Sequence, residues 1–133
     1  MFNDCKLAGK SLTCDIKFIE NLELLCSPPA LKELCREICR ENQFHILKEI
    51  EHIFDDGPGY TLIFILSESH LAIHTFPERQ FFSFDLYTCK EYENNTVYED
   101  IYNKLLTVFQ ASEQKSYYQI TDRKFTGSNV FQI

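Results

Sequence analysis

The chain has 133 residues and a formal net charge of −7, from 13 Lys and Arg against 20 Asp and Glu. This length suits one domain that buries a core without disulfide or metal staples, and a hydrophobic fraction of 44% excludes a disordered chain. The acidic balance argues against nucleic acid as a partner, because phosphate binding requires clustered Lys and Arg. No apolar run approaches the roughly 20 residues of a spanning helix, and the N-terminus lacks a signal-peptide pattern. We therefore expect a cytoplasmic protein that binds neither nucleic acid nor membrane.

Predicted elements begin with a strand and a helix. Leu12–Phe18 alternates apolar and polar residues, which is typical of a half-buried strand. Ser27 then caps a helix with Pro28 in its first turn. The apolar stripe of this helix comprises Leu31, Leu34, Cys35, Ile38 and Cys39. The chain has six cysteines but no Cys-x-x-Cys pair, so we expect reduced thiols, most of them buried in the core.

The middle of the chain is predicted to be a series of strands. They are expected at Phe44–Phe54, Tyr60–Ser67, His70–Thr75 and Phe82–Leu86, with a turn at 55–59 where Gly and Pro gather. Another turn is expected at Phe76-Pro77-Glu78.

A helix and a strand are expected to complete the chain. Thr96 and Glu99 form a capping box that opens the second helix, and Tyr117–Thr121 predicts a last strand. The inner face of this helix is expected to carry Val97, Ile101, Leu105 and Val108. Because most strands are joined by short links, the order predicts an α+β fold over residues 1–133: a two-layer sandwich, its sheet largely antiparallel, with two helices on one face.

Polar residues are densest between Ser67 and Glu78, where two His, two Ser and two Glu follow the most apolar strand. Such a cluster at a strand end is a candidate site. The pair His70 and His74 would converge on a metal in a helix, but in a strand four residues span about 13 Å, which argues against a metal site. Ser69 and His74 are five residues apart, so in a regular strand they point to opposite faces, and no Gly-x-Ser-x-Gly elbow supports a hydrolase triad.

The segment from Leu66 to Glu78, together with Asp85-Leu86-Tyr87-Thr88-Cys89, closely resembles the self-processing region of the short prokaryotic S-adenosylmethionine decarboxylases. The Glu-Ser-His-x-x-x-His core, the following Pro-Glu and a Cys twenty residues after the Ser stand at the spacing of that family. Gly9-Lys10-Ser11-Leu12 and the order of the elements extend the resemblance over most of the chain.

The resemblance implies a proenzyme that cuts itself between Glu68 and Ser69, giving chains 1–68 and 69–133. Ser69 would become the pyruvoyl cofactor, a ketone that forms a Schiff base with the substrate amine and accepts electrons as CO2 leaves. His74 would assist removal of the Ser69 α-proton, since an imidazole titrates near neutrality, and Thr61 would hydrogen-bond the oxyanion. Cys89 is the implied acid that reprotonates the product.

The resemblance also implies a substrate site. Glu78 matches the carboxylate that binds the ribose hydroxyls of S-adenosylmethionine. The family Phe that stacks on adenine stands six residues before the position of Thr61; here that position is Asp55, and Phe54 lies one residue further away. Leu62 and Phe76 stand where the family commonly has Gly and Trp.

Three functions are therefore open at the level of sequence. The first is S-adenosylmethionine decarboxylase of spermidine synthesis. The second is a pyruvoyl-dependent ornithine or arginine decarboxylase on the same scaffold, because Asp55 and Asp56 beside the site favour a cationic substrate. The third is a non-processing regulatory homologue. By resemblance we expect a homodimer of cleaved protomers with sites near the subunit interface.

Overall fold

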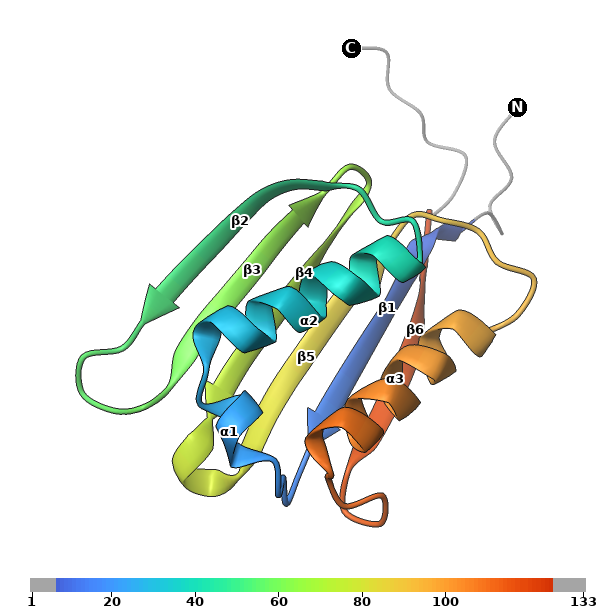
Figure 1. Cartoon of the computed structure of the whole chain (residues 1–133). Helices are drawn as coiled ribbons and strands as arrows, with labels where there is room; N and C mark the ends of the chain where they lie inside the picture. The colour runs from blue at the N-terminus through green and yellow to red at the C-terminus, as the bar shows by residue number, and fades with distance from the viewer. Residues whose placement is uncertain (1–6, 126–133) are drawn as a thin grey trace.

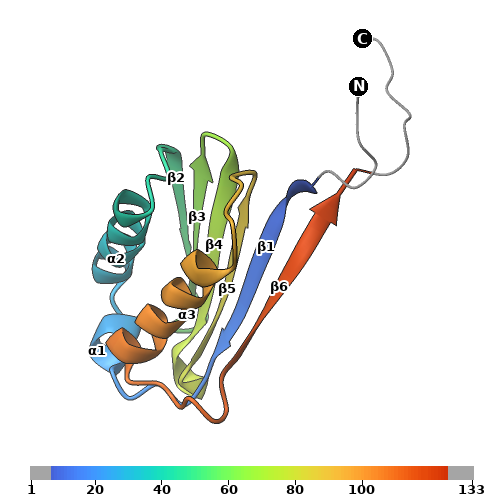
Figure 2. The same ribbon diagram turned by 90° about the vertical axis from the view of Figure 1, so that its right-hand side faces the viewer.

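The computed structural model describes residues 7–125, which form one sheet covered on a single face by helices. Figure 2 shows the helices on one side of the strands and nothing on the other, so the molecule has two layers. We call the uncovered side the open face. The elements are β1 (Leu7–Ile16), α1 (Leu22–Leu25), α2 (Pro28–Glu41), β2 (Ile46–Ile53), β3 (Tyr60–Leu66), β4 (Ser69–Phe76), the 3-10 helix η1 (Pro77–Arg79), β5 (Phe81–Thr88), α3 (Thr96–Phe109) and β6 (Tyr117–Lys124).

Within residues 7–125 the sheet has six strands in the order β2-β3-β4-β5-β1-β6, and every neighbouring pair is antiparallel. Strands β2 to β5 form a meander of hairpins, and β1 then inserts between β5 and β6 (Figure 1). The predicted α+β class and antiparallel sheet are confirmed. Among residues 7–125, no helix has the length and apolar character needed to cross a bilayer.

The core lies between the sheet and the helices. On β5, Phe82, Phe84 and Leu86 are buried against the helical layer, whereas the residues between them face the open side. The same alternation holds for β3 and β4, as expected for an antiparallel sheet with one covered face. Along these strands, the period-2 pattern of the sequence therefore separates residues buried in the core from residues on the open face, where a site can form.

Replacing the central Phe84 by Ala is expected to lower the free energy of unfolding by about 3–5 kcal/mol, because a fully buried phenyl ring leaves a cavity in a packed core. Urea denaturation measures this change directly. The exposed Phe18, at 58% relative exposure, is the matched control, and its replacement by Ala is expected to cost much less. Equal losses for the two variants would contradict this description of the core.

Helix α2 follows the sequence prediction closely. Ser27 caps it, with its hydroxyl accepting a hydrogen bond from the Ala30 amide at 3.2 Å. All five residues of the predicted stripe, including Cys35 and Cys39, are buried. Burial raises the pKa of the Cys39 thiol to about 11, and the pKa of Cys35 rises further. Both thiols are free and pack in the core, as does the free thiol of Cys14. Cys26 and Cys89 are also free but exposed, and Cys5 lies outside the described residues.

The predicted bounds of β1 and the predicted cap of α3 were wrong, and the bounds of β2, β3, β4 and β6 differ from the prediction by one to three residues. Strand β1 begins at Leu7 rather than Leu12, because pairing with β6 extends it through a segment without alternation, and it ends before Phe18, whose φ is 55°. The capping box at Thr96 does not form: Asn95 occupies the cap of α3, and Asn94 accepts a hydrogen bond from the Thr96 amide instead.

The helical layer itself also departs from prediction. The four-residue helix α1 was not predicted, since one turn carries no periodicity. On α3, aromatic residues fill the buried stripe, which comprises Tyr98, Ile101, Tyr102, Leu105 and Phe109, whereas Val97 and Val108 are partly buried.

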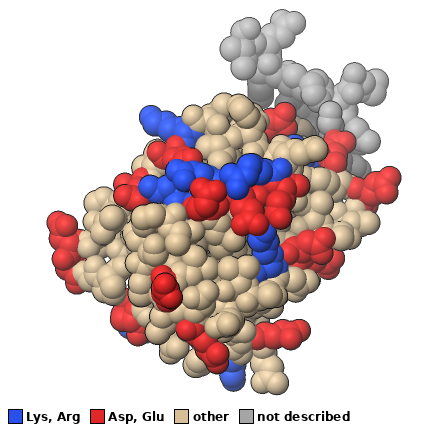
Figure 3. Space-filling view, viewed as in Figure 1, with Lys and Arg blue, Asp and Glu red and all other residues tan. Residues whose placement is uncertain are grey.

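The outer surface of the helices is strongly charged. Figure 3 shows acidic and basic side chains alternating over α2. Arg36 makes two hydrogen bonds to Glu49 of β2, and Lys104 of α3 contacts both Glu37 and Glu41. The Arg36 guanidinium lowers the pKa of Glu49. These ion pairs connect α2 to β2 and α3 on the solvent-exposed surface of the helices.

Candidate active site

A cavity of about 510 Å³ opens at one end of the sheet, where the β2–β3 loop faces η1. Four residues singled out from the sequence line it: Phe54, Thr61, His74 and Glu78. Asp56 also lines the cavity, whereas Asp55, its neighbour in the chain, is not among the lining residues. The cavity therefore combines an aromatic ring, two carboxylates, a hydroxyl and an imidazole.

Thr61 and His74 form the central polar pair of this cavity. They lie opposite each other on β3 and β4, and the Thr61 Oγ1 and His74 Nδ1 atoms are 2.9 Å apart. Both side chains lie on the open face, because the residues next to them in each strand are buried under the helices. A Cβ atom on Gly59 would lie 2.8 Å from the carbonyl oxygen of Thr75, so a glycine is needed for β3 to start this close to β4.

Ser69 lies at the other end of β4. The exposed turn formed by Ser67 and Glu68 joins β3 to β4, and Ser69 is the first residue after it. Its backbone is paired on both sides, with Leu66 of β3 and Thr88 of β5. The peptide bond between Glu68 and Ser69 is thus accessible, while the residue that follows it is anchored in the sheet.

Cys89 follows directly after β5 and is exposed. Because Thr88 pairs with Ser69, the thiol belongs to the same end of the sheet as the Glu68–Ser69 bond. A second cavity of about 280 Å³ beside it is lined by Cys89, Lys10 and Lys90, among others. Ser69 and Cys89 therefore share one end of the sheet.

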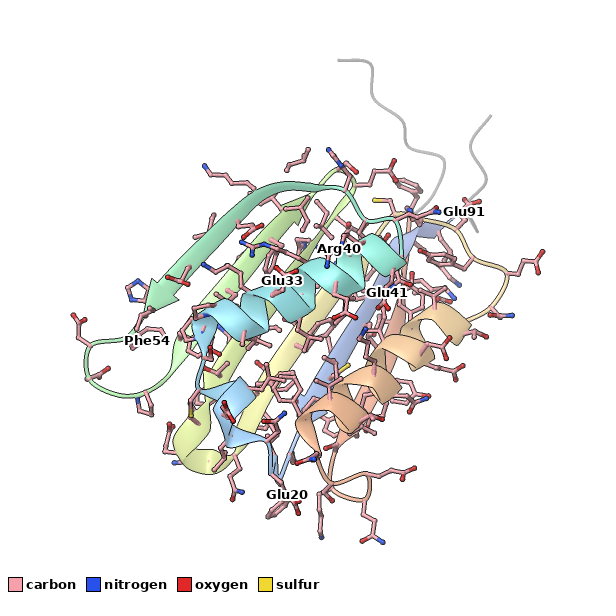
Figure 4. The ribbon with its side chains drawn as sticks, viewed as in Figure 1. Glu20, Glu33, Arg40, Glu41, Phe54 and Glu91 are labelled. Carbon is pink, nitrogen blue, oxygen red and sulfur yellow. The ribbon has the colours of Figure 1, made fainter. Side chains whose placement is uncertain are left out.

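The candidate residues fall into two groups at opposite ends of the strands. Figure 4 shows Phe54 at one end of the sheet and Glu91, two residues beyond Cys89, at the other. From Ser69 to His74, five strand residues correspond to about 16 Å. In the alternation along β4, Ser69 falls on the side covered by the helices, whereas His74 lies on the open face. One copy of the chain therefore does not bring the two side chains together.

Sequence reasoning missed two residues near these groups. The sequence identified Asp56 only as one of two acidic residues in a loop beside the site. Its place in the wall of the cavity depends on how that loop folds. Tyr87 contacts Cys89 through its hydroxyl, yet only its place two residues before the thiol could have pointed to it. Within residues 7–125, no group of three or more His, Cys, Asp or Glu side chains is arranged to bind a metal ion.

The fold and these residues define a class: a two-layer α+β domain with a serine after an exposed hairpin turn and a hydroxyl–imidazole pair on the open face of its sheet. The family model for S-adenosylmethionine decarboxylase matches residues 10–120. The chain belongs to the S-adenosylmethionine decarboxylase family.

Individual relatives agree with this assignment. The chain is 36% identical over 74 residues to an S-adenosylmethionine decarboxylase proenzyme of Aeropyrum pernix, which covers 56% of this chain and 55% of that one. It is 36% identical over 81 residues to the proenzyme of Symbiobacterium thermophilum, with 61% and 60% covered. The chain thus spans little more than half the length of these two curated relatives.

A solved structure shares the fold. The crystal structure of the adenosylmethionine decarboxylase from Aquifex aeolicus superposes with a TM-score of 0.75 and covers 96% of this chain and 99% of its own. The two sequences are 19% identical in this alignment, so the likeness concerns the fold.

Proposed function

We propose that this protein is a self-processing, pyruvoyl-dependent S-adenosylmethionine decarboxylase of polyamine synthesis. The observation that carries the proposal is the position of Ser69 directly after an exposed turn peptide, paired with Thr88 at the end of β5, the residue before Cys89. Membership of the family and the proenzyme names of the relatives support it. The mature protein would consist of chains 1–68 and 69–133.

In the cleavage reaction, the Ser69 hydroxyl attacks the carbonyl carbon of Glu68, and the peptide bond becomes an ester. Thr61 donates a hydrogen bond to the developing oxyanion, and His74 accepts the α-proton of Ser69. Loss of that proton expels the Glu68 carboxylate and leaves a dehydroalanine, whose hydrolysis releases ammonia. The product is a new N-terminal keto acid in place of Ser69.

The residues around Ser69 fit such a group. Its backbone is held between β3 and β5, so the new N-terminus would stay anchored after cleavage. A ketone at this position would supply an electron sink for a substrate amine that loses CO2. Cys89 would return a proton to the α-carbon of the product, because its thiol lies at the same end of the sheet as Ser69. Glu78 accepts hydrogen bonds from the ribose hydroxyls, and Phe54 supplies an aromatic surface near the cavity.

The separation of the two groups supports a composite site in a homodimer. The open face carries Ile50, Ile63, Ile65, Ala72 and Phe76, which are apolar side chains without a covering layer. Two copies packed with their open faces together, about a two-fold axis perpendicular to the strands, would set Thr61 and His74 of one copy over the exposed Glu68–Ser69 turn peptide of the other. Because the Ser69 side chain has the register of the covered side, cleavage in such a dimer requires Ser69 to turn toward the interface. Each of the two resulting sites would then contain residues from both copies.

The choice of substrate is tested by CO2 release from carboxyl-labelled S-adenosylmethionine, ornithine and arginine under identical conditions. S-adenosylmethionine is expected to give the highest kcat/KM, because the cavity offers an aromatic ring beside carboxylates for a large cationic nucleoside. A higher value for ornithine or arginine would overturn this assignment and leave a pyruvoyl decarboxylase of amino acids. With no CO2 from any substrate and no cleavage, a regulatory homologue would be indicated.

A further inference from the structure

We propose that Tyr87 is a positioning residue that orients the thiol of Cys89 at the Ser69 end of the sheet. The expected effect of Tyr87 on turnover rests on the proposed function, whereas the hydrogen bond between Cys89 and Tyr87 does not. The Cys89 thiol donates a hydrogen bond to the Tyr87 hydroxyl, with 3.8 Å between sulfur and oxygen. That hydroxyl donates its own proton to the carbonyl oxygen of Ala8 at 2.8 Å.

The direction of these two bonds matters for the chemistry. Because the single proton of the phenol is committed to Ala8, its oxygen can only accept from the thiol. The contact therefore fixes the direction of the S–H bond of Cys89, the group that the proposed function uses as an acid.

The phenol ring is held on both sides. The ring of His70, directly opposite on β4, lies 5.8 Å away between centroids, and the Arg123 guanidinium lies 5.7 Å from the ring centroid. Arg123 also donates a hydrogen bond to the Ser11 hydroxyl at 3.2 Å. Gly9 leaves the space for the phenol, since a Cβ atom there would lie 2.9 Å from the Tyr87 hydroxyl, and its φ of +153° suits glycine.

The backbone that carries the thiol is also fixed. Lys90 donates hydrogen bonds from its amide to the Thr88 hydroxyl and from its Nζ atom to the carbonyl oxygen of Gln43, at 3.0 and 2.8 Å. Thr88 is fully buried. Both neighbours of Cys89 are thus anchored, and Tyr87 adds the contact that fixes the thiol.

The test compares Tyr87→Phe, which keeps the ring, with Tyr118→Phe, which removes a hydroxyl bonded to Glu99 elsewhere. Alkylation by iodoacetamide requires a sulfur atom that is free to attack, so loss of the contact with the phenol oxygen is expected to speed the reaction of Cys89 about threefold. Peptide mass mapping follows Cys89 and, in the same sample, the exposed Cys26 as an internal reference. Tyr118→Phe is expected to leave both rates unchanged.

Turnover supplies the second readout. With S-adenosylmethionine, Tyr87→Phe is expected to lower kcat about tenfold while KM and the extent of self-cleavage stay unchanged. An unchanged Cys89 alkylation rate, or faster alkylation with an unchanged kcat, would overturn the proposal. Faster alkylation in a protein whose wild type releases no CO2 would uphold the contact and refute the proposed function instead.

Discussion

Replacing Ser69 by Ala is expected to abolish both self-cleavage and decarboxylation. The methyl side chain has no oxygen to attack the Glu68 carbonyl, and no keto acid can form at that position. Denaturing electrophoresis and CO2 release measure the two losses. The variant is expected to fold like the wild type, because its backbone pairs with Leu66 and Thr88 are kept.

Ser67→Ala is the matched control for this variant. Ser67 lies in the same exposed turn, two residues earlier, and its backbone amide rather than its hydroxyl makes the contact with His45. It is expected to cleave normally. Decarboxylation by Ser69→Ala at the wild-type rate would refute the pyruvoyl assignment, whatever the control shows.

Co-expression of two inactive variants, Ser69→Ala and His74→Ala, is expected to restore about a quarter of wild-type activity. In a composite site, one of the two sites in each mixed dimer receives Ser69 from one copy and His74 from the other, so it is intact. Random pairing makes about half of the dimers mixed, and half of their sites are functional. Differently tagged copies allow the mixed dimer to be purified before CO2 release is measured.

The position of Cys89 provides the control for this experiment. Ser69 and Cys89 share one end of the sheet, so each dimeric site takes both from the same copy. Ser69→Ala with Cys89→Ala is therefore expected to remain inactive. If this pair recovered activity while Ser69→Ala with His74→Ala did not, the proposed arrangement of the two copies would be wrong.

The fold was largely predictable because its signals are local. Alternation at Phe82–Leu86 and the stripe from Leu31 to Cys39 each report which side of an element is buried, and the structure agrees at both. The start of β1 and the insertion of β1 between β5 and β6 depend on pairing between distant segments. No local pattern in residues 7–11 carries that information.

The sequence singled out candidate site residues, but it did not reveal how they are laid out in space. Spacing and resemblance identified Ser69, His74, Thr61 and Cys89, and the period-2 rule indicated that Ser69 and His74 face opposite ways. The contact of Tyr87 with Ala8 depends on the register between β1 and β5, which the sequence does not display.

Intact mass measurement on the freshly purified, folded protein tests the central claim most directly. The account predicts two fragments, residues 1–68 and 69–133, the second blocked to N-terminal sequencing and 2 mass units heavier after borohydride reduction of its ketone. A single unbroken chain of 15.7 kDa that releases CO2 from S-adenosylmethionine would contradict it.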